Sequence, residues 1–398
     1  MLFRSPLTAA IGDQRSIDGV TLYPVGHLRR DVRLGFVAYL QRDLTFLARA
    51  ALEAFRLHRH RRYDVVQVHT MPDYLVFAAL FPKLMGAKVL LDVHDLVPEL
   101  YASKFGGKES SLIVRMTRFA ERRSIAFADH ALAVHEPHLD VLVGHGNPRG
   151  KFTIVMNVPD QARFRRLPER STPPAAFTLI YHGTVSSRHG LASAVRALVL
   201  ARRSHDDIRL EVVGDGDGIG ELRSLVEQLE LAEAVTVTEG RFPPEELQPL
   251  FERASAGIVP ITDDVFARFM LPTKLLEYVA LGLPVISSRT QTIQAYFDDT
   301  MVSFVEPGDE ADLSEKILEL RRDAERRVQL VAAADAFLAQ HSWSRERERY
   351  FAVIDSLVGA GESKPGREGH RRRHGERGRR RRSAGEASVR ELGDRGSS

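Results

Sequence analysis

Residues 63–94, which read YDVVQVHTMPDYLVFAALFPKLMGAKVLLDVH, decide the fold class of this 398-residue chain. They hold two apolar runs rich in Val and Leu, at 63–69 and 87–94, each with the length of a buried strand. The apolar segment 75–84 between them predicts a helix, which Gly86 ends. A strand, a helix and a strand in this order form a β-α-β unit with parallel strands.

The same alternation runs through most of the chain. The first half adds helices at 36–61 and 111–127 and a strand at 130–134. The second half has expected strands at 177–181, 208–213, 235–238, 257–260 and 284–287, and expected helices at 191–201, 219–229, 244–254, 273–281 and 313–339. The pattern predicts an α/β protein with two doubly wound, Rossmann-like domains.

Changes in composition mark the expected domain boundaries. A polar connector with several Pro residues, near 157–174, divides the chain into an N-terminal domain at 1–165 and a second domain at 166–343. An amphipathic helix at 344–358 follows. Residues 359–398 are rich in Gly, Arg, Ser and Glu and have almost no apolar side chains, so we predict a disordered basic tail.

Overall composition narrows the class of protein. Hydrophobic residues make up 43% of the chain, enough for two domains with cores of their own. The absence of Cys excludes disulfides and thiolate metal sites and fits a reducing compartment. No apolar run approaches the roughly 20 residues that span a bilayer, and the N-terminus lacks the layout of a signal peptide. We therefore expect a cytoplasmic protein.

The net charge of +3 is unevenly distributed. Residues 361–398 hold 12 Lys and Arg against 6 Asp and Glu, so the tail carries +6 and the rest of the chain −3. Such a tail could bind nucleic acid non-specifically, but it has no aromatic residues to stack on bases. The alternatives are a solvated tail or weak contact with an anionic membrane. Contact with lipid headgroups and plain solvation are also both open for the basic end of helix 36–61, formed by Arg56, Arg59, Arg61 and Arg62.

Two Gly-containing loops follow expected strands of the second half, where ligands of doubly wound sheets bind. In the loop 181–190, Gly183 lets a ligand approach the backbone and Arg188 can fork onto phosphate oxygens. An ordinary strand-to-helix turn with a surface Arg is the alternative. The second loop contains Gly214 and Gly216, but it lacks the third Gly of a dinucleotide fingerprint and is weak by itself.

The stretch 271–286 is the most informative of the loop regions. Pro272 opens a helix where its missing N–H costs nothing, and the amides of Thr273 and Lys274 are free to take an anionic group. Glu277 lies one turn further, among apolar neighbours, where its carboxylate suits a diol such as ribose. The alternative for Glu277 is a helix-dipole partner or a surface charge.

His94, Asp95 and Glu99 follow a strand of the first half, and we expect them at the mouth of the cleft. The alternative for a single His after a strand is a structural residue. A zinc site is conceivable, but the spacing of these groups matches no standard ligand pattern, so no metal site is predicted.

Four segments, taken together in their order and spacing, resemble the retaining glycosyltransferase family 4. They are residues 181–190, 213–216, 240–243 and 272–285, and the resemblance covers nearly the whole ordered chain. It implies the GT-B fold, in which two Rossmann-like domains face a cleft, with the N-terminal domain on the acceptor side. It also implies that helix 344–358, with Trp343 before it, crosses back onto the N-terminal domain.

The resemblance also implies site residues and a function. Gly183 and Arg188 would hold the donor pyrophosphate, Lys274 the distal phosphate and sugar, Glu277 the ribose, and His94 would lie on the acceptor side. The expected set comprises His94, Arg188 and Lys274 as catalytic residues, Gly183, Thr184, Gly214, Arg241, Phe242, Pro272, Thr273 and Glu277 as donor-binding residues, and Asp95 and Glu99 on the acceptor side.

This chain departs from the family pattern at three places. Thr184 and His189 stand where many members have Arg and Lys, so Arg188 is expected to bear most of the phosphate charge. Phe269 stands where many members have a Glu that contacts the donor sugar. Residues 1–6 do not form an apolar strand with a Gly-rich loop, so the first strand is expected to be missing or the domain abbreviated.

The expected function is retaining transfer of a hexosyl group from a nucleotide-diphosphate sugar to an acceptor, without a cofactor. No Asp-x-Asp pair suitable for a divalent metal follows a strand, which favours a metal-independent enzyme. A glycan or lipid-linked acceptor in envelope polysaccharide biosynthesis would fit, with the enzyme peripheral at the inner membrane face. The alternatives are a GT-B epimerase that uses water at the same nucleotide site, and a nucleic-acid-binding protein that acts through the tail. A phosphorylase would need a Lys for pyridoxal phosphate, and no convincing candidate is present.

Overall fold

The computed structural model describes residues 15–17, 20–23, 25, 36–104, 111–168 and 175–359. The predictions for residues 1–6, for the Pro-rich end of the connector and for the tail beyond Gly359 lie outside the described residues. By internal contacts the chain divides into a compact unit that ends at Ile354 and a second unit that begins at Asp355. Both large sheets lie in the first unit, and the predicted domain boundaries within it remain predictions.

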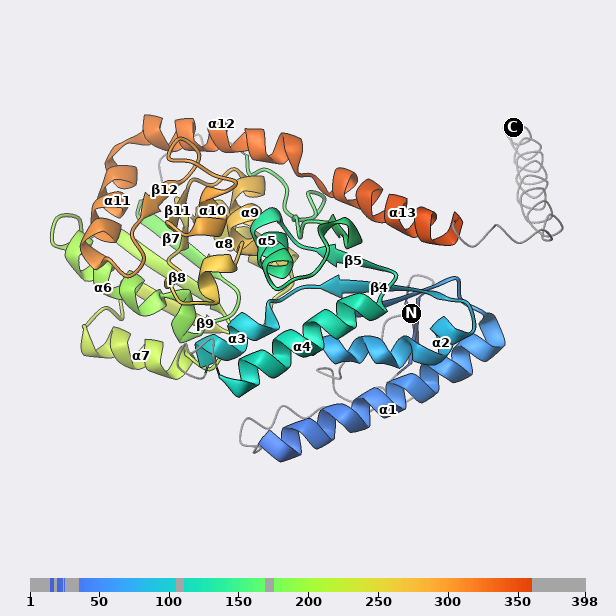
Figure 1. Cartoon of the computed structure of the whole chain (residues 1–398). Coiled ribbons are helices and arrows are strands. Elements are labelled where there is room, and N and C mark those ends of the chain that lie inside the picture. The colour runs from blue at the N-terminus through green and yellow to red at the C-terminus, as the bar shows by residue number, and fades with distance from the viewer. Residues whose placement is uncertain are drawn as a thin grey trace, which may run out of the picture. The chain divides into compact units, whose positions relative to one another are not determined.

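The sheet of the first half has four parallel strands in the order β3-β4-β5-β6. These are β3 (Val65–His69), β4 (Lys88–Val93), β5 (His130–Ala133) and β6 (Phe152–Ile154). The helical segments among them are α1 (Phe36–Arg61), the 3-10 helix η1 (Asp73–Ala79), α2 (Leu80–Leu84), α3 (Val97–Lys104), α4 (Leu112–Phe127), α5 (Glu136–Gly144) and the 3-10 helix η2 (Arg149–Lys151). A separate antiparallel pair is formed by β1 (Arg15–Ile17) and β2 (Val20–Leu22). Figure 1 shows α2 beside α1.

The sheet of the second half has six parallel strands in the order β12-β11-β10-β7-β8-β9 (Figure 1). These are β7 (Phe177–His182), β8 (Ile208–Gly214), β9 (Val235–Glu239), β10 (Ala256–Val259), β11 (Val285–Ser288) and β12 (Ser303–Val305). The helical segments are η3 (Ser187–His189), α6 (Leu191–Arg202), α7 (Ile219–Gln228), α8 (Pro244–Arg253), η4 (Ala267–Phe269), α9 (Thr273–Leu281), α10 (Gln291–Gln294), α11 (Glu310–Arg322) and α12 (Ala324–Gln340). The strand order reverses between β7 and β10, which is where doubly wound sheets bind ligands.

The prediction of an α/β protein with two parallel sheets and helices around them is confirmed, and several local predictions need correction. The helix expected at 313–339 is two helices, because Asp323 ends α11 and its side chain caps α12 by accepting a hydrogen bond from the amide of Arg326 at 2.8 Å. The segment expected as one helix at 75–84 begins as the 3-10 helix η1. Three α-helices (α3, α5, α10) and four strands (β1, β2, β6, β12) were not expected.

Helix α13 (Trp343–Gly359) forms hydrogen bonds to the first half of the chain. The fully buried carboxylate of Glu346 accepts a hydrogen bond from the amide of Met156 at 2.9 Å and also pairs with Arg349. The Tyr350 hydroxyl donates to Oε1 of Gln67 in β3 at 2.5 Å. These contacts tie the last helix to the first sheet.

Tyr278 of α9 packs tightly on the strands beneath it. Its ring is fully buried, and its hydroxyl donates to the carbonyl of Ile180 in β7 at 3.0 Å. A Cβ at Gly257 in β10 would lie 2.3–2.7 Å from three ring atoms of Tyr278. The close approach of α9 to the sheet therefore requires glycine at position 257.

A network of buried charged side chains joins α3, α4 and the end of α5. His145 lies 3.0 Å from Glu121 through Nδ1 and 3.1 Å from Glu99 through Nε2. Asn147 donates a further hydrogen bond to Glu121 at 2.9 Å. Burial opposes protonation of His145, but the hydrogen bonds to Glu121 and Glu99 outweigh it and raise the pKa to about 9. The imidazolium thus links the two carboxylates at neutral pH.

We expect Gly257→Ala to lower the free energy of unfolding by about 1–3 kcal/mol, because the added methyl group overpacks the Tyr278 ring. The control is Gly220→Ala on α7, where an added Cβ meets nothing within 4 Å. That substitution should be neutral or stabilising by roughly 0.5–1 kcal/mol, since Ala is the better helix former. Urea unfolding of both variants measures the difference, and equal effects would contradict the packing at Gly257.

We expect His145 to make stability pH-dependent between about 6.5 and 9. The folded-state pKa lies above the ordinary value of 6.5, so the stabilisation is present below pH 6.5 and is lost as pH rises through 9. The full effect is on the order of 3 kcal/mol. Unfolding free energies measured across this range should fall for the wild type and stay flatter for His145→Gln. Parallel pH profiles for the two proteins would rule the network out.

Candidate functional site

A cavity of about 500 Å³ is lined by residues of both halves of the chain. From the first half come residues that directly follow β4 and β5, and from the second half come residues that follow β7 and those at the start of α9. The carboxyl ends of β7 and β10 meet here, at the point where the strand order of the second sheet reverses. The sequence led us to expect ligand chemistry at this place.

Lys274, in the first turn of α9, presents a buried amine to this cavity. Its side chain is 8% exposed, and Nζ donates to the Tyr181 hydroxyl at 2.7 Å and lies 4.0 Å from the centre of the Tyr181 ring. Burial lowers the pKa of Lys274 to about 7, although the charge of Glu277 raises it in part. The ammonium is therefore only partly formed near neutral pH, and a bound anion would restore it.

Glu277, one turn further along α9, lines the cavity and is held by His182. The carboxylate lies 2.6 Å from Nε2 of His182, whose Nδ1 lies 2.9 Å from the Tyr278 hydroxyl. His182 is buried at the end of β7, directly before Gly183. His182 falls within the segment 181–190 that the sequence singled out, but no role was predicted for it. Its position at the end of a predicted strand, directly before Gly183, could have indicated that it lies at the site.

The loop after β7 brings Gly183 and Thr184 to the cavity. Gly183 has φ +109°, and a Cβ there would lie 3.5 Å from Cε of Lys274. Glycine thus suits both the left-handed backbone and an uncovered Lys274 amine. Gly214 does not line the cavity: a Cβ on it would lie 1.7 Å from the carbonyl oxygen of Gly183, so its glycine serves the packing of two loops.

The two arginines expected at the donor site do not line the cavity. The guanidinium of Arg188 lies 5.4 Å from the ring centre of Phe266, a cavity residue, and Arg188 is half-buried. The exposed Arg241 pairs with Asp215 at 2.9 Å, while its neighbour Phe242 does line the cavity. Arg188 thus contacts a residue that lines the cavity but does not line the cavity itself.

The start of α9 supplies the other expected donor-site residues. Pro272 is buried at the N-cap, and Thr273 is exposed in the first helical turn. Both line the cavity together with Lys274. Free amides in a first helical turn favour an anionic ligand, as the sequence indicated.

Three further histidines line the cavity, and sequence analysis gave none of them a part in the site: His135, His138 and His189. Burial lowers the pKa of His135 to about 4 and that of His138 to about 3. Burial also lowers the pKa of His189 to about 3, helped by the charges of Lys274 and Arg188. All three are neutral at physiological pH. His135 directly follows the strand predicted at 130–134, and His138 lies three residues further on, which was the signal for them.

Among the expected acceptor-side residues, His94 and Asp95 line the cavity. Burial raises the pKa of Asp95, and the charges of His94 and Arg188 lower it. The expectation that Glu99 stands at the mouth of the cleft is wrong. Glu99 belongs to α3, is 6% exposed and pairs with His145. The segment forms a helix that turns this carboxylate into the protein interior.

Comparisons with known proteins agree with this architecture. Residues 176–323 match a family model described as Glycosyl transferases group 1. Residues 6–157 match a model described as Glycosyl transferase 4-like domain. The second match covers the four-stranded sheet, and the first covers the six-stranded sheet with the start of α9.

Curated relatives are distant in sequence. The amylovoran biosynthesis glycosyltransferase AmsK of Erwinia amylovora is 23% identical over 197 residues, which are 49% of this chain and 48% of AmsK. A glycogen synthase of Mycobacterium tuberculosis is 26% identical over 250 residues, 61% of this chain and 56% of that protein. The chain thus spans about half the length of these relatives.

Solved structures share the fold at low sequence identity. Sucrose-phosphate synthase of Thermosynechococcus elongatus has a TM-score of 0.67 at 16% identity, covering 90% of this chain and 88% of that one. HepE of Anabaena, solved in complex with UDP, has a TM-score of 0.61 at 14% identity, covering 84% and 85%. The two family models together cover most of the chain, and with the GT-B fold they place it among the group 1 glycosyltransferases.

Proposed function

We propose that this glycosyltransferase transfers a hexosyl group, with retention of configuration, from a nucleotide-diphosphate sugar to a glycan or lipid-linked acceptor. The observation that carries the donor half is the pairing of Lys274 and Glu277 on one face of α9, both directed to the same cavity. An amine and a carboxylate one helical turn apart match a diphosphate and a ribose diol. We assign residues 1–165 to the acceptor side and residues 166–343 to the donor.

In this proposal the diphosphate binds at the start of α9. The first-turn amides and the Lys274 amine provide donors for its oxygens, and the uncovered backbone at Gly183 lets it approach. Its charge would return the proton that burial takes from Lys274. HepE has been solved with UDP and with UDP-glucose, which supports a ligand of this class.

Glu277 would bind the ribose, held in place by His182. The 2.6 Å contact with Nε2 orients the carboxylate before the ligand arrives, so little ordering is left for the binding step. The Phe242 side chain, also at the cavity, would border the nucleotide base.

Departure of the nucleoside diphosphate needs stabilisation of negative charge. We propose that Lys274, Arg188 and the helix amides supply it without a metal, with single preorganised donors worth roughly 3–4 kcal/mol. Arg188, which does not line the cavity, would act on the departing group through its electrostatic field. The acceptor attacks the face of the sugar that the diphosphate leaves, and a diphosphate oxygen takes the acceptor proton. His94 and Asp95 would orient the acceptor.

Two readings from the sequence are less favoured. A GT-B epimerase needs the same nucleotide site, but the curated relatives named above are transferases or synthases. A nucleic-acid-binding role would rest on the tail alone, outside the described residues. Transfer therefore remains the proposed activity.

A membrane-linked acceptor is supported by an exposed apolar ridge on α4. Leu112, Met116 and Phe119 are 60–69% exposed and spaced so that they share one helix face. Arg115, Arg122 and Arg123 are exposed on the same helix. Apolar side chains among arginines suit the headgroup region of an anionic leaflet. AmsK is named for amylovoran biosynthesis, which supports a role in polysaccharide assembly.

The helices give no sign of a membrane span: within the described residues, none is both long and apolar enough to cross a bilayer. We propose that membrane contact by these residues is peripheral. We propose the inner, cytoplasmic face as its place.

We expect calorimetric titration with UDP, GDP, ADP and dTDP to find one nucleotide that binds tightly. Lys274→Met and Glu277→Ala should each weaken it by about 10–100-fold, since each removes a charge-assisted contact worth roughly 1.5–3 kcal/mol. Wild-type affinity should fall as pH rises above about 7, where Lys274 loses its proton, and the affinity of Lys274→Met should not. Glu227→Gln, at an exposed site on α7, serves as the control. Binding of none of the four by a folded wild type would refute the donor site.

We expect the wild type to sediment with phosphatidylglycerol vesicles and not with phosphatidylcholine vesicles. The double variant Met116→Glu with Phe119→Glu should bind at least about tenfold more weakly, because two exposed apolar side chains that would enter the lipid are lost. Val328→Glu on α12 is the matched control, since Val328 is 68% exposed but lies in the second half. Equal losses in both variants would show that added charge, and not the ridge, is responsible.

A further inference from the structure

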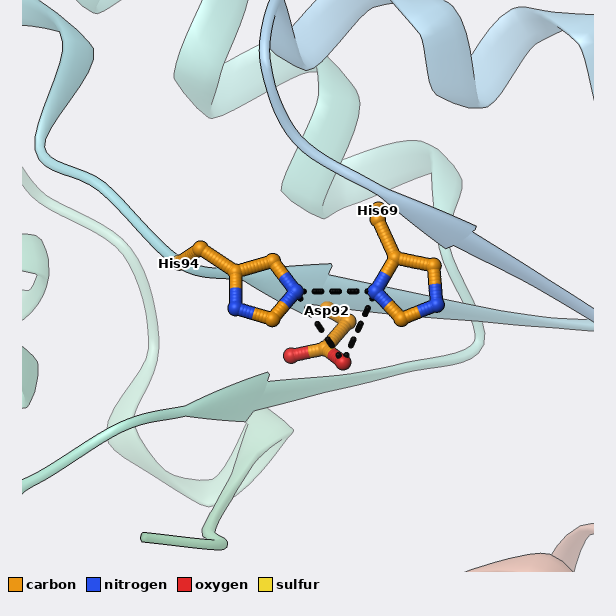
Figure 2. Close-up of side chains that lie close together, drawn as sticks. All are labelled: His69, Asp92 and His94. Carbon is orange, nitrogen blue, oxygen red and sulfur yellow. Dashed lines mark hydrogen bonds and ion pairs between the residues drawn. The ribbon is translucent and has the colours of Figure 1, made fainter. Parts of the chain in front are cut away.

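Three side chains converge where β3 and β4 end, beside the cavity. His69 is the last residue of β3 and lies directly opposite Asp92 of β4 in the strand register. His94 follows Asp92 by two residues, a spacing that puts two side chains on the same face of an extended segment. Figure 2 shows the two imidazoles with the Asp92 carboxylate beside both.

The three facing atoms form a tight triangle. Nδ1 of His69 lies 2.8 Å from Nε2 of His94. Oδ2 of Asp92 lies 3.1 Å from the first of these nitrogens and 3.4 Å from the second. The imidazole planes are nearly parallel, at 12°.

Hydrogen bonds cannot satisfy all three edges of this triangle at once while Asp92 is ionised. If one nitrogen carries a proton, the other turns a lone pair towards the carboxylate oxygen. If both carry protons, two N–H groups meet across 2.8 Å. A cation among the three atoms removes both conflicts, because each atom then directs a lone pair at it.

We propose that His69, Asp92 and His94 bind a divalent transition metal of the zinc class. Two imidazole nitrogens and one carboxylate oxygen are ligands that Zn²⁺ takes at about 2.0–2.2 Å. Tetrahedral bonds of that length hold ligand atoms roughly 3.3–3.6 Å apart. The triangle therefore needs to open by a few tenths of an ångström along two of its edges.

The surroundings of the triangle fit a metal site. Gln67 donates to Oδ2 of Asp92 at 3.1 Å, and Tyr350 of α13 donates to Gln67, so the carboxylate is held from outside. The side chains of His69 and His94 are 43% and 34% exposed, which leaves an approach for the ion. Three protein ligands leave a fourth position for water or another oxygen, as in catalytic zinc sites.

The proposed ion stands apart from the donor diphosphate. Its ligands belong to the first sheet, whereas Lys274 and Glu277 belong to α9 of the second half. Since His94 also lines the cavity, the ion would place a Lewis acid at the acceptor wall. Metal binding at these three residues does not depend on the proposed donor site and is tested separately from it.

The test is calorimetric titration of the full, tag-free and metal-stripped protein with Zn²⁺, with the visible absorption of Co²⁺ as a second readout. We expect one ion per chain and a four-coordinate Co²⁺ spectrum. His69→Gln and Asp92→Asn should each weaken Zn²⁺ binding by at least about 100-fold and abolish the spectrum. Gln67→Met keeps all three ligands and removes the hydrogen bonds of Gln67 to Asp92, His69 and Tyr350, so it should weaken binding by about 10–100-fold. His60→Gln, an exposed histidine at the end of α1, is the matched control and should change nothing.

The outcomes separate the site from a hydrogen-bonded trio. Zn²⁺ affinity that is equal in the wild type, His69→Gln and Asp92→Asn would assign the ion to other histidines and overturn the proposal. Failure of the wild type to give a four-coordinate Co²⁺ spectrum would overturn it as well. Melting temperatures without metal are the folding control. If a ligand variant does not fold, Gln67→Met and the wild-type spectrum still decide.

Discussion

The contact between the Tyr278 hydroxyl and the end of β7 sets the geometry of the donor site. The Tyr278 hydroxyl donates to the carbonyl oxygen of Ile180. It also lies 3.1 Å from the backbone amide nitrogen of His182 and 2.9 Å from Nδ1 of the same residue. This fixes the rotation of α9 against the sheet. Lys274 then faces Tyr181, and Glu277 faces His182, so two consecutive strand residues meet two residues of one helical turn.

The charge at the site depends on the burial of its basic side chains. A buried amine next to an aromatic ring loses part of its proton, and three buried histidines lose theirs. The side chains of the cavity thus carry much less positive charge at neutral pH than its Lys and His residues suggest. Charge returns only when an anion arrives, which couples protonation of the site to its occupation.

Much of the fold could be predicted from the sequence because it depends on local signals. The bounds of α9 and α1 follow from apolar spacing and from Pro272 and Gly282, and the strands follow from short Val-rich runs. The loop after β7 was located for the same reason. Gly183, Lys274 and Glu277 all reach the cavity, since their placement depends mainly on which element they begin or follow.

Side-chain direction could not be predicted in this way, because it depends on partners distant in sequence. Glu99 turns inward to meet His145, 46 residues later. Arg241 turns to Asp215, and Arg188 lies against Phe266. His69 and His94 meet only because β3 and β4 pair in one register. A linear motif carries none of these distances.

The bond between Glu346 and Met156 has a consequence for synthesis of the chain. The amide of Met156 is buried, and its carboxylate partner follows 190 residues later. While the ribosome is still making the second half, the Met156 amide cannot bond to Glu346. Gln67 likewise lacks the hydrogen bond from Tyr350. These two hydrogen bonds of the first half therefore form only after α13 has been made. Chains that stop before α13 would therefore have unpaired polar groups at Met156 and Gln67 in the first half. Chaperones that bind incomplete chains would be expected to act on that half.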